Sequence, residues 1–172
     1  TGTMAHSYIT SYGSSVQGEY NAFSDYIKTH RGEGLILLID TYDTLKSGVP
    51  NAIKVFDEVL KPLGIRPKGI RIDSGDIAYL SKKARKMLDD AGYPDCSIVA
   101  SNSLDEEIIL ALIRQGAEID SFGVGERLIT SRSTPVFGGV YKLVAVEKNG
   151  SIIPKIKISE NAAKITNPHY KK

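Results

Sequence analysis

Short apolar segments recur along this chain about every 30 residues, and each is followed at once by polar or glycine residues. These polar strings begin at Asp40, Asp73, Ser101 and Gly123. Asp40 and Asp73 are about 33 residues apart and Asn102 follows about 29 residues later, which matches the roughly 30 residues of a βαβ unit. Since parallel strands are joined by right-handed crossovers, the spacing predicts an α/β fold with a parallel sheet.

Apolar runs and helical periodicity locate the individual elements. Continuous apolar runs predict strands that are buried on both faces at 35–39, 69–72, 98–100 and 119–122. Amphipathic spacing predicts helices at 19–30, 50–63 and 80–91, and a fourth that ends at Gly116. The fourth helix is expected to begin with a capping box formed by Ser103 and Glu106.

The last third of the chain has a different pattern. Segments 139–147 and 152–158 flank the pair Asn149-Gly150, which is the strongest short-range signal for a β-hairpin. The residues from Ser159 onward are polar. We therefore expect two parts, an α/β portion over 1–135 that carries the functional site and a β-hairpin with a polar tail over 136–172.

Composition excludes several classes of function. The 172 residues are 41% hydrophobic, enough for one ordinary core, and 22 basic residues against 20 acidic ones give a net charge of +2. This net charge is too small to give the positive electrostatic field of a protein that binds nucleic acids non-specifically. The longest apolar run, Leu35 to Ile39, is far shorter than the ~20 residues of a membrane-spanning helix, and no signal-peptide pattern precedes it. We expect a cytoplasmic protein without nucleic-acid or membrane partners, in which the single Cys96 is a small buried residue without a role.

The strings that follow the strands form the candidate site, because ligands bind at the carboxyl ends of parallel strands. Arg71 and Asp73 lie on the same side of a predicted strand. A guanidinium there can hold a phosphate, and a carboxylate can hold a ribose hydroxyl or Mg²⁺. A purely structural ion pair between the two side chains is the open alternative. After the turn at Ser74-Gly75, Asp76 is the predicted cap of the next helix.

Two further loops have the chemistry of a phosphate clamp. Ser101-Asn102-Ser103 offers amides and hydroxyls, and Gly123-Val124-Gly125 leaves the backbone open to an anion just before Glu126-Arg127. Each loop alone is equally typical of an ordinary turn. Together, at neighbouring strand ends, they predict phosphate binding.

His6 is the candidate nucleophile or base. It lies among small residues that would let a bulky group approach its ring, and a neutral imidazole is a competent nucleophile near neutral pH. A carboxylate such as Asp40 or Asp43 is expected to hold the other ring nitrogen. An ordinary hydrogen-bonded histidine remains the alternative.

Taken in order, the strings resemble those of one known family. They are Gly-Thr-Met-Ala-His-Ser at 2–7, Ile-Asp-Thr-Tyr-Asp-Thr-Leu at 39–45, Arg-Ile-Asp-Ser-Gly-Asp at 71–76, Gly-Val-Gly at 123–125 and Gly-Gly-Val-Tyr-Lys-Leu-Val at 138–144. In this order and spacing they resemble the bacterial nicotinate phosphoribosyltransferases over nearly the whole chain. The resemblance implies a central-to-C-terminal fragment of such an enzyme.

The resemblance also implies a fold and an activity. The fold is a portion of an irregular parallel α/β barrel of the type II phosphoribosyltransferase kind, with an appended β-hairpin. The activity is phosphoribosyl transfer from phosphoribosyl diphosphate to nicotinate, giving nicotinate mononucleotide for NAD biosynthesis. The implied cofactors are Mg²⁺ and ATP, the latter coupled through a phosphohistidine at His6, and the implied full-length protein is a homodimer.

Site residues follow from the same resemblance. The implied catalytic residues are His6, Asp40 and Asp73, and the implied substrate- or phosphate-binding residues are Arg71, Ser74, Gly75, Ser101, Asn102, Gly123, Gly125 and Glu126. Glu126 departs from the family pattern, which has a small hydroxyl residue at this place. A carboxylate beside a phosphate loop repels the ligand unless it turns outward or binds Mg²⁺. No metal-ligand set is implied for the chain itself.

Two other classes of function remain open from the sequence. One is a non-catalytic α/β fragment that binds phosphate or a sugar phosphate without turnover. The other is a structural fragment whose sheet does not close and whose strand edges stay exposed.

Overall fold

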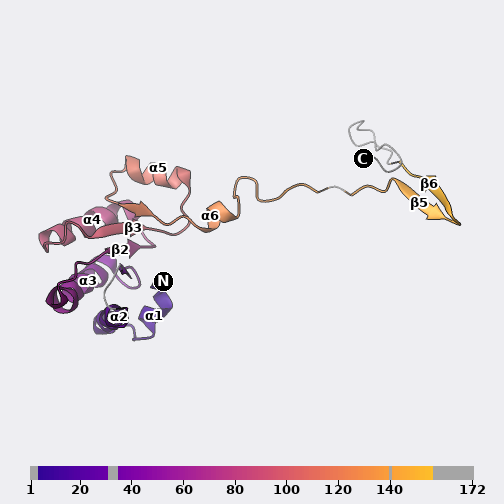
Figure 1. Ribbon diagram of the computed structural model, residues 1–172. Coiled ribbons are helices and arrows are strands. Elements are labelled where there is room, and N and C mark those ends of the chain that lie inside the picture. Colours follow the sequence, from indigo (N-terminus) through magenta and orange to yellow (C-terminus); the bar gives the residue numbers. More distant parts are fainter. Residues whose placement is uncertain (1–3, 31–34, 140, 157–172) are drawn as a thin grey trace. The chain divides into compact units, whose positions relative to one another are not determined.

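The computed structural model describes residues 4–30, 35–139 and 141–156, and it divides into two compact units (Figure 1). Unit 1 spans Thr1–Arg132 and unit 2 spans Ser133–Lys172. We describe each unit by itself. The polar tail expected from Ser159 lies outside the described residues.

Unit 1 is built around a parallel sheet whose strands lie in chain order, β1-β2-β3-β4. The strands are β1 (Ile36–Leu38), β2 (Gly69–Ile72), β3 (Ser97–Ala100) and β4 (Ser121–Phe122). All three neighbouring pairs are parallel. The sequence therefore predicted the strands and their direction correctly. Strands that follow one another in chain order are also the arrangement found in α/β barrels.

Helices precede β1 and connect the strands, and Figure 1 shows α2 to α5 following one another along the sheet. The helical elements of unit 1 are α1 (His6–Thr10), α2 (Val16–Thr29), η1 (Thr44–Gly48), α3 (Val49–Val55), η2 (Phe56–Leu60), η3 (Lys61–Leu63), α4 (Ile77–Asp90), α5 (Glu106–Arg114) and α6 (Glu126–Ile129). Here η1 and η2 are π-helical turns and η3 is a 3₁₀ turn. None of the described helices has the length and apolar character needed to cross a membrane.

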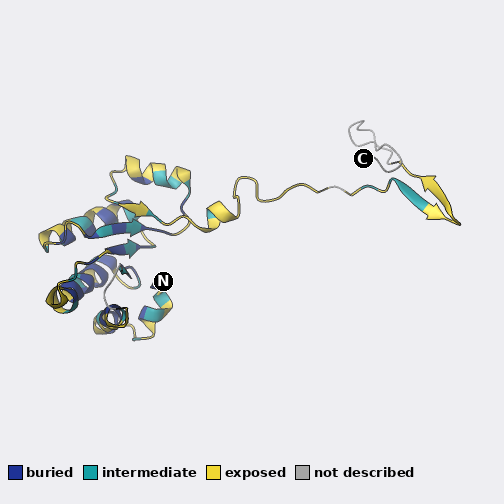
Figure 2. Ribbon diagram, in the orientation of Figure 1, coloured by how far each residue is buried: buried dark blue, intermediate teal, exposed yellow. Residues whose placement is uncertain are grey.

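The core lies between the sheet and helices α2, α3 and α4, where Figure 2 shows buried residues in dark blue. Its largest fully buried side chains include Phe23, Phe56, Leu38, Ile70 and Leu88. Each such side chain contributes about 1.5–3 kcal/mol through its removal from water. A smaller cluster under α5 contains Ala78, Ala100, Leu104 and Leu112. By contrast, α5 and α6 remain largely exposed (Figure 2).

Two predictions about helices were wrong in detail. The single helix expected over 50–63 is not regular, since α3 ends at Val55 and is followed by the π-helical turn η2 and then by the 3₁₀ turn η3. The capping box at Ser103 does not form, because Ser103 itself has a left-handed backbone with φ of 51°. Asp105 caps α5 instead, and its side chain accepts a hydrogen bond from the amide of Ile108 at 2.9 Å.

The cap predicted for α4 is present. Asp76 accepts a hydrogen bond from the amide of Tyr79 at 3.0 Å, directly after Gly75, whose φ of 79° favours glycine. Helix α4 therefore begins immediately beyond the carboxyl end of β2. The turn chemistry read from the sequence thus places the start of this helix next to the site.

Unit 2 contains the expected hairpin. Strands β5 (Ala145–Lys148) and β6 (Ser151–Pro154) pair antiparallel across Asn149-Gly150. Both turn residues have positive φ, 54° and 76°, as a two-residue hairpin turn requires. The strands are shorter than the segments 139–147 and 152–158 expected from the sequence, and residues 140 and 157–158 lie outside the described part of the chain.

Gly48 is the position in unit 1 where the fold demands glycine most strictly. A Cβ atom there would overlap the carbonyl oxygen of Ile39, because the end of η1 folds back onto the end of β1. We expect Gly48→Ala to lower the free energy of unfolding of the complete protein by about 1–3 kcal/mol or more, since the clash is with backbone. Urea unfolding measures this. Gly138→Ala, where a Cβ meets nothing within 4 Å, is the matched control, and an equal effect of both substitutions would contradict the expectation.

Candidate active site

Asp40 joins the carboxyl ends of β1 and β2. Its Oδ2 accepts hydrogen bonds from the amide of Asp73 at 2.9 Å and from the hydroxyl of Ser74 at 2.6 Å. Asp40 is buried, and its Oδ1 has no hydrogen-bond partner among the described residues. A buried carboxylate with a free oxygen is costly to maintain, so this atom is a candidate ligand atom.

Asp73 extends the same connection to β3. Its Oδ1 accepts a hydrogen bond from the hydroxyl of Ser101 and lies 3.8 Å from Nη1 of Arg71. Its Oδ2 lies 3.9 Å from Nε2 of His6. Asp73 therefore faces a hydroxyl, a guanidinium and an imidazole, which come from three different parts of the chain.

His6 lies at the start of α1 and approaches the strand ends from outside the sheet. Its Nδ1 forms a hydrogen bond of 2.9 Å with Oγ1 of Thr41, while Nε2 faces Asp73. The expectation that Asp40 or Asp43 holds the second ring nitrogen is therefore wrong. Asp40 is occupied by the turn after β2, and Asp43 caps η1 by accepting from the amides of Leu45 and Lys46.

Arg71 connects the site to the segment that carries His6. Besides its ion pair with Asp73, its Nη2 donates a hydrogen bond to the carbonyl oxygen of Met4 at 2.8 Å. The Arg71 side chain is four-fifths buried. The predicted ion pair thus exists, and the same side chain also fixes the backbone two residues before His6.

The third strand end carries backbone strain. Asn102 and Ser103 both have left-handed backbones, with φ of 82° and 51°. Such conformations are costly for residues other than glycine, although asparagine tolerates them best. Ser101 precedes this turn and its hydroxyl is already engaged with Asp73. The side chain of Asn102 is exposed, and it forms no hydrogen bond to the other predicted site residues.

The fourth strand end brings its glycine loop only partly to the site. Gly123 lies close to the end of β3: a Cβ atom added at Gly123 would come within 3.3 Å of Cβ of Ser101. A Cβ atom added at Gly125 would meet no atom within 4 Å, so on that side the backbone is open to close approach by a ligand. Glu126 is exposed, and no hydrogen bond or ion pair joins its side chain to the other described site residues.

An ion-pair cluster fixes the segment after the glycine loop. Asp105, the cap of α5, accepts hydrogen bonds from Nη1 of Arg127 in α6 and from Nη1 of Arg132 at 2.9 Å. The amide of Ile108 and then the guanidinium of Arg127 hold the pKa of the Asp105 carboxyl below its usual range. Arg127, which follows the glycine loop and Glu126 in sequence, belongs to this cluster in the structure.

Mg²⁺ fits the site only as an ion that a substrate helps to hold. The part of the chain that the structure describes has no group of three or more His, Cys, Asp or Glu side chains arranged to hold a metal. Mg²⁺, however, is commonly bound by one or two carboxylates together with substrate phosphates and waters. The free Oδ1 of Asp40 and the nearby Asp73 provide such carboxylates.

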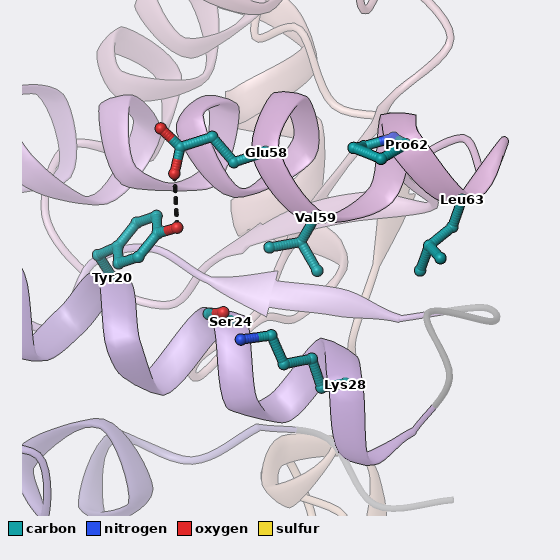
Figure 3. A pocket seen from close by; sticks show the side chains of 7 residues that line it. All are labelled: Tyr20, Ser24, Lys28, Glu58, Val59, Pro62 and Leu63. Atoms are coloured by element: carbon teal, nitrogen blue, oxygen red, sulfur yellow. Dashed lines mark hydrogen bonds between the residues drawn. The ribbon is translucent and has the colours of Figure 1, made fainter.

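A groove of about 510 Å³ lies elsewhere, between α2 and the turns η2 and η3 (Figure 3). Its lining residues are Tyr20, Ser24, Lys28, Glu58, Val59, Pro62 and Leu63. It shares none of the predicted site residues. Tyr20 donates a hydrogen bond to Glu58 at 2.6 Å across it, so its polar groups are partly paired already.

Two residues at the site were missed by the sequence reasoning. Thr41 holds the ring of His6, and the carbonyl of Met4 holds Arg71. Thr41 immediately follows a strand-end carboxylate, which was a usable signal for it. The contact with Met4 had no such signal, because any backbone carbonyl can accept a hydrogen bond.

Cys96 is buried as expected, and burial raises the pKa of its thiol to about 12.

Comparison with known proteins gives the site its context. No family model matches the chain. Among solved structures, human nicotinic acid phosphoribosyltransferase matches with a TM-score of 0.58 at 24% identity, over 72% of this chain and 34% of that one. Nicotinate phosphoribosyltransferase from Porphyromonas gingivalis matches with a TM-score of 0.57 at 24% identity, over 97% of this chain and 44% of that one. The parallel sheet with its charged strand ends thus has the fold of the type II phosphoribosyltransferases.

Sequence similarity narrows this class to one family. A curated nicotinate phosphoribosyltransferase of Bacillus subtilis is 51% identical over 100% of this chain and 34% of its own length. Relatives with the same name from Dictyostelium discoideum and Homo sapiens are 48% and 37% identical over 93% and 78% of this chain. The chain belongs to the nicotinate phosphoribosyltransferase family. It spans about a third or less of the length of these curated relatives, 34%, 27% and 25%.

The Asp105 cluster allows us to predict whether the free energy of unfolding rises or falls as the pH is lowered. Because the folded-state pKa of Asp105 is lowered, its ionised form contributes stability above the ordinary value of 3.8, and this is lost as the pH falls through the folded pKa. We expect Asp105→Asn to reduce the free energy of unfolding at about pH 7 and to cost much less at about pH 3. Urea unfolding at the two pH values tests this. Asp90→Asn, in an exposed pair with Lys86, should show a smaller dependence, and a pH-independent cost of Asp105→Asn would refute the assignment.

Proposed function

We propose that the complete protein transfers ribose 5-phosphate from phosphoribosyl diphosphate to the ring nitrogen of nicotinate, giving nicotinate mononucleotide for NAD biosynthesis. The observation that carries this proposal is the convergence of His6 from α1 with Arg71 and Asp73 at the carboxyl end of β2, next to Asp40 at the end of β1. The names of the curated relatives agree with it. The homodimer and the cytoplasmic location are parts of the same proposal, and they rest on the family resemblance alone.

The chemistry of this transfer is mainly electrostatic. The diphosphate leaving group gains negative charge as the bond to ribose breaks, so cations that are fixed in place before the reaction stabilise the transition state. Arg71 is such a cation, because Asp73 and the Met4 carbonyl hold its guanidinium. Mg²⁺, when bound with the substrate, supplies further positive charge, and Asp40 and Asp73 are the residues that would hold it.

His6 is proposed to accept a phosphoryl group from ATP. In the tautomer with its proton on Nδ1, that proton is donated to Thr41 and the lone pair of Nε2 is free. Attack of Nε2 on the γ-phosphorus then forms an N–P bond while the bond to the ADP oxygen breaks, and ADP leaves. The proton on Nδ1 stays where it is throughout. The phosphorylated ring would add charge beside Asp73, at the place where the diphosphate and its Mg²⁺ are expected.

The remaining predicted residues are proposed to hold phosphate. The open backbone at Gly125 and the exposed Asn102 border the strand ends. Gly75 lets the turn after β2 fold back tightly, and Gly123 lies against Ser101. Ser74 and Ser101 already donate their hydroxyls to Asp40 and Asp73, so their backbone amides are the groups we expect to face a ligand.

Replacing His6 tests the ATP coupling. We expect His6→Ala in the complete protein to show equal rates of nicotinate mononucleotide formation with and without ATP, because the group that receives phosphate is gone. The basal rate should remain measurable, since Arg71 and Asp73 are retained. The assay uses phosphoribosyl diphosphate, nicotinate and Mg²⁺. His30→Ala, an exposed histidine that caps α2, should keep the stimulation by ATP. If ATP still stimulates the His6→Ala variant, His6 has no part in the ATP-dependent step. If calorimetry shows that the wild-type protein binds phosphoribosyl diphosphate but the assay detects no product, the protein is a binding module.

Glu126 should weaken the binding of the diphosphate substrate. We expect Glu126→Gln to lower the KM for phosphoribosyl diphosphate about two- to fivefold at low ionic strength, since an exposed negative charge beside the glycine loop is removed. Salt should shrink the effect, because exposed charges are screened. Glu118→Gln, before β4 at the opposite end of that strand, is the control and should leave the KM unchanged. A raised KM for Glu126→Gln would instead indicate that this carboxylate binds Mg²⁺.

A further inference from the structure

Glu19 is a fully buried carboxylate that the proposed mechanism does not use. It lies in the first turn of α2 with 0% exposure. Its Oε2 accepts hydrogen bonds from the hydroxyl of Ser47 and from Nδ2 of Asn51, the latter at 2.9 Å, while Oε1 has no partner among the described residues. Burial raises the pKa of this carboxyl, and the two hydrogen bonds oppose the rise. A buried acid of this kind is expensive, so its place in the fold needs a reason.

The donors lie at the end of the turn that carries the site and in the helix that follows it, Ser47 in η1 and Asn51 in α3. We call residues 40–48 the 40–48 turn. It leaves β1 at Ile39. The amides of Ser47 and Gly48 donate to the carbonyl of Asp43, each at 2.9 Å, which closes the turn on itself. The turn then returns to the end of β1, because Gly48 lies against the Ile39 carbonyl. Asp40 and Thr41 lie inside this closed loop. Whatever fixes Ser47 therefore fixes the loop on which the two site residues stand.

The 40–48 turn is attached to the α1–α2 segment at three points. Thr41 bonds to the His6 ring, Tyr42 donates its hydroxyl to the Gly13 carbonyl at 3.0 Å, and Ser47 donates to Glu19. Two of these attachments are at least partly open to solvent. The attachment through Glu19 is fully buried, and Asn51 strengthens it by also donating to the Val16 carbonyl at 2.9 Å. Water cannot replace the acceptor that Glu19 provides there.

We propose that Glu19 is a positioning residue for the ATP-dependent step: through Ser47 and Asn51 it sets the distance between the 40–48 turn and α1, and so holds Thr41 against His6 Nδ1. This role rests on the function proposed above for His6. The ring is held on one side by Thr41 only, because its other nitrogen is 3.9 Å from Asp73. A small displacement of the turn therefore releases the ring from the tautomer that leaves Nε2 free. Misplacement of a reacting group by about 1 Å can cost about a hundredfold in rate.

The test compares Glu19→Ala with Glu19→Gln in the complete protein. Alanine removes the acceptor of both buried donors, whereas the amide oxygen of glutamine can accept from both. We expect Glu19→Ala to reduce the rate of ATP-dependent phosphorylation of His6 about tenfold or more, and Glu19→Gln to restore it to within about threefold. The ¹⁵N resonances of the His6 ring should show the mixed tautomers of a ring without its Thr41 bond in the alanine variant, and the wild-type pattern in the glutamine variant.

Two control variants separate positioning from loss of stability. Tyr42→Phe removes the exposed attachment of the same turn and should leave both readouts unchanged. Tyr93→Phe removes a hydrogen bond to Asp57 of 2.8 Å away from the turn, so it reports what destabilisation alone does to His6. If Glu19→Ala does not fold, Ser47→Ala removes one donor and leaves the charged partner satisfied by Asn51.

The readouts also separate this inference from the proposed function. Ring resonances report the Thr41–His6 contact in a protein with no activity at all, so an inactive wild-type protein would defeat the proposed function and leave the positioning role measurable. The positioning role is overturned if Glu19→Ala keeps the wild-type ring resonances, if Tyr93→Phe changes them equally, or if Glu19→Gln fails to restore them.

Discussion

The hydrogen bonds that Asp40 accepts from the Asp73 amide and the Ser74 hydroxyl are the interaction on which the candidate site depends. Backbone pairing alone sets the register of β1 and β2 but not the direction of the chain beyond them. The buried carboxylate of Asp40 fixes that direction, because the desolvation of a charge is tolerable only when donors face it. Once the turn after β2 is fixed, the side chain of Asp73 can point towards His6 and Arg71.

The same pattern continues across the sheet. The ends of β1, β2 and β3 are tied together by pairs of a carboxylate and a serine, first Asp40 with Ser74 and then Asp73 with Ser101. These bonds hold the carboxylates in place before any ligand arrives, which is what electrostatic catalysis requires. Only Asp73 of the two carboxylates pairs with the guanidinium of Arg71 among the described residues, so the site keeps an excess of negative charge next to a fixed cation. Such a site suits a substrate that brings both phosphates and Mg²⁺.

Much of the fold was predictable because its signals are local and repeated. The apolar runs, their spacing and the cap at Asp76 are written into short stretches of sequence, and the structure contains all of them. The capping box at Ser103 failed because a left-handed turn displaced the cap to Asp105, two residues later. The helix predicted over 50–63 gives way to the turns η2 and η3, where Pro62 has no amide hydrogen with which to continue α-helical hydrogen bonding. The roles given to the site residues remain predictions.

Contacts between distant segments explain what the sequence could not supply. Asp40 was expected to hold the ring of His6, yet it is the next residue in sequence, Thr41, that binds the ring, while Asp40 binds the turn after β2. Their side chains point in different directions as the chain leaves β1, so adjacency in sequence gives them different partners. The buried Glu19 is a similar case, since nothing local distinguishes it from a solvent-facing helix residue. Only the return of the 40–48 turn to α2, imposed by Gly48 and completed by Ser47 and Asn51, makes its carboxylate part of the architecture of the site.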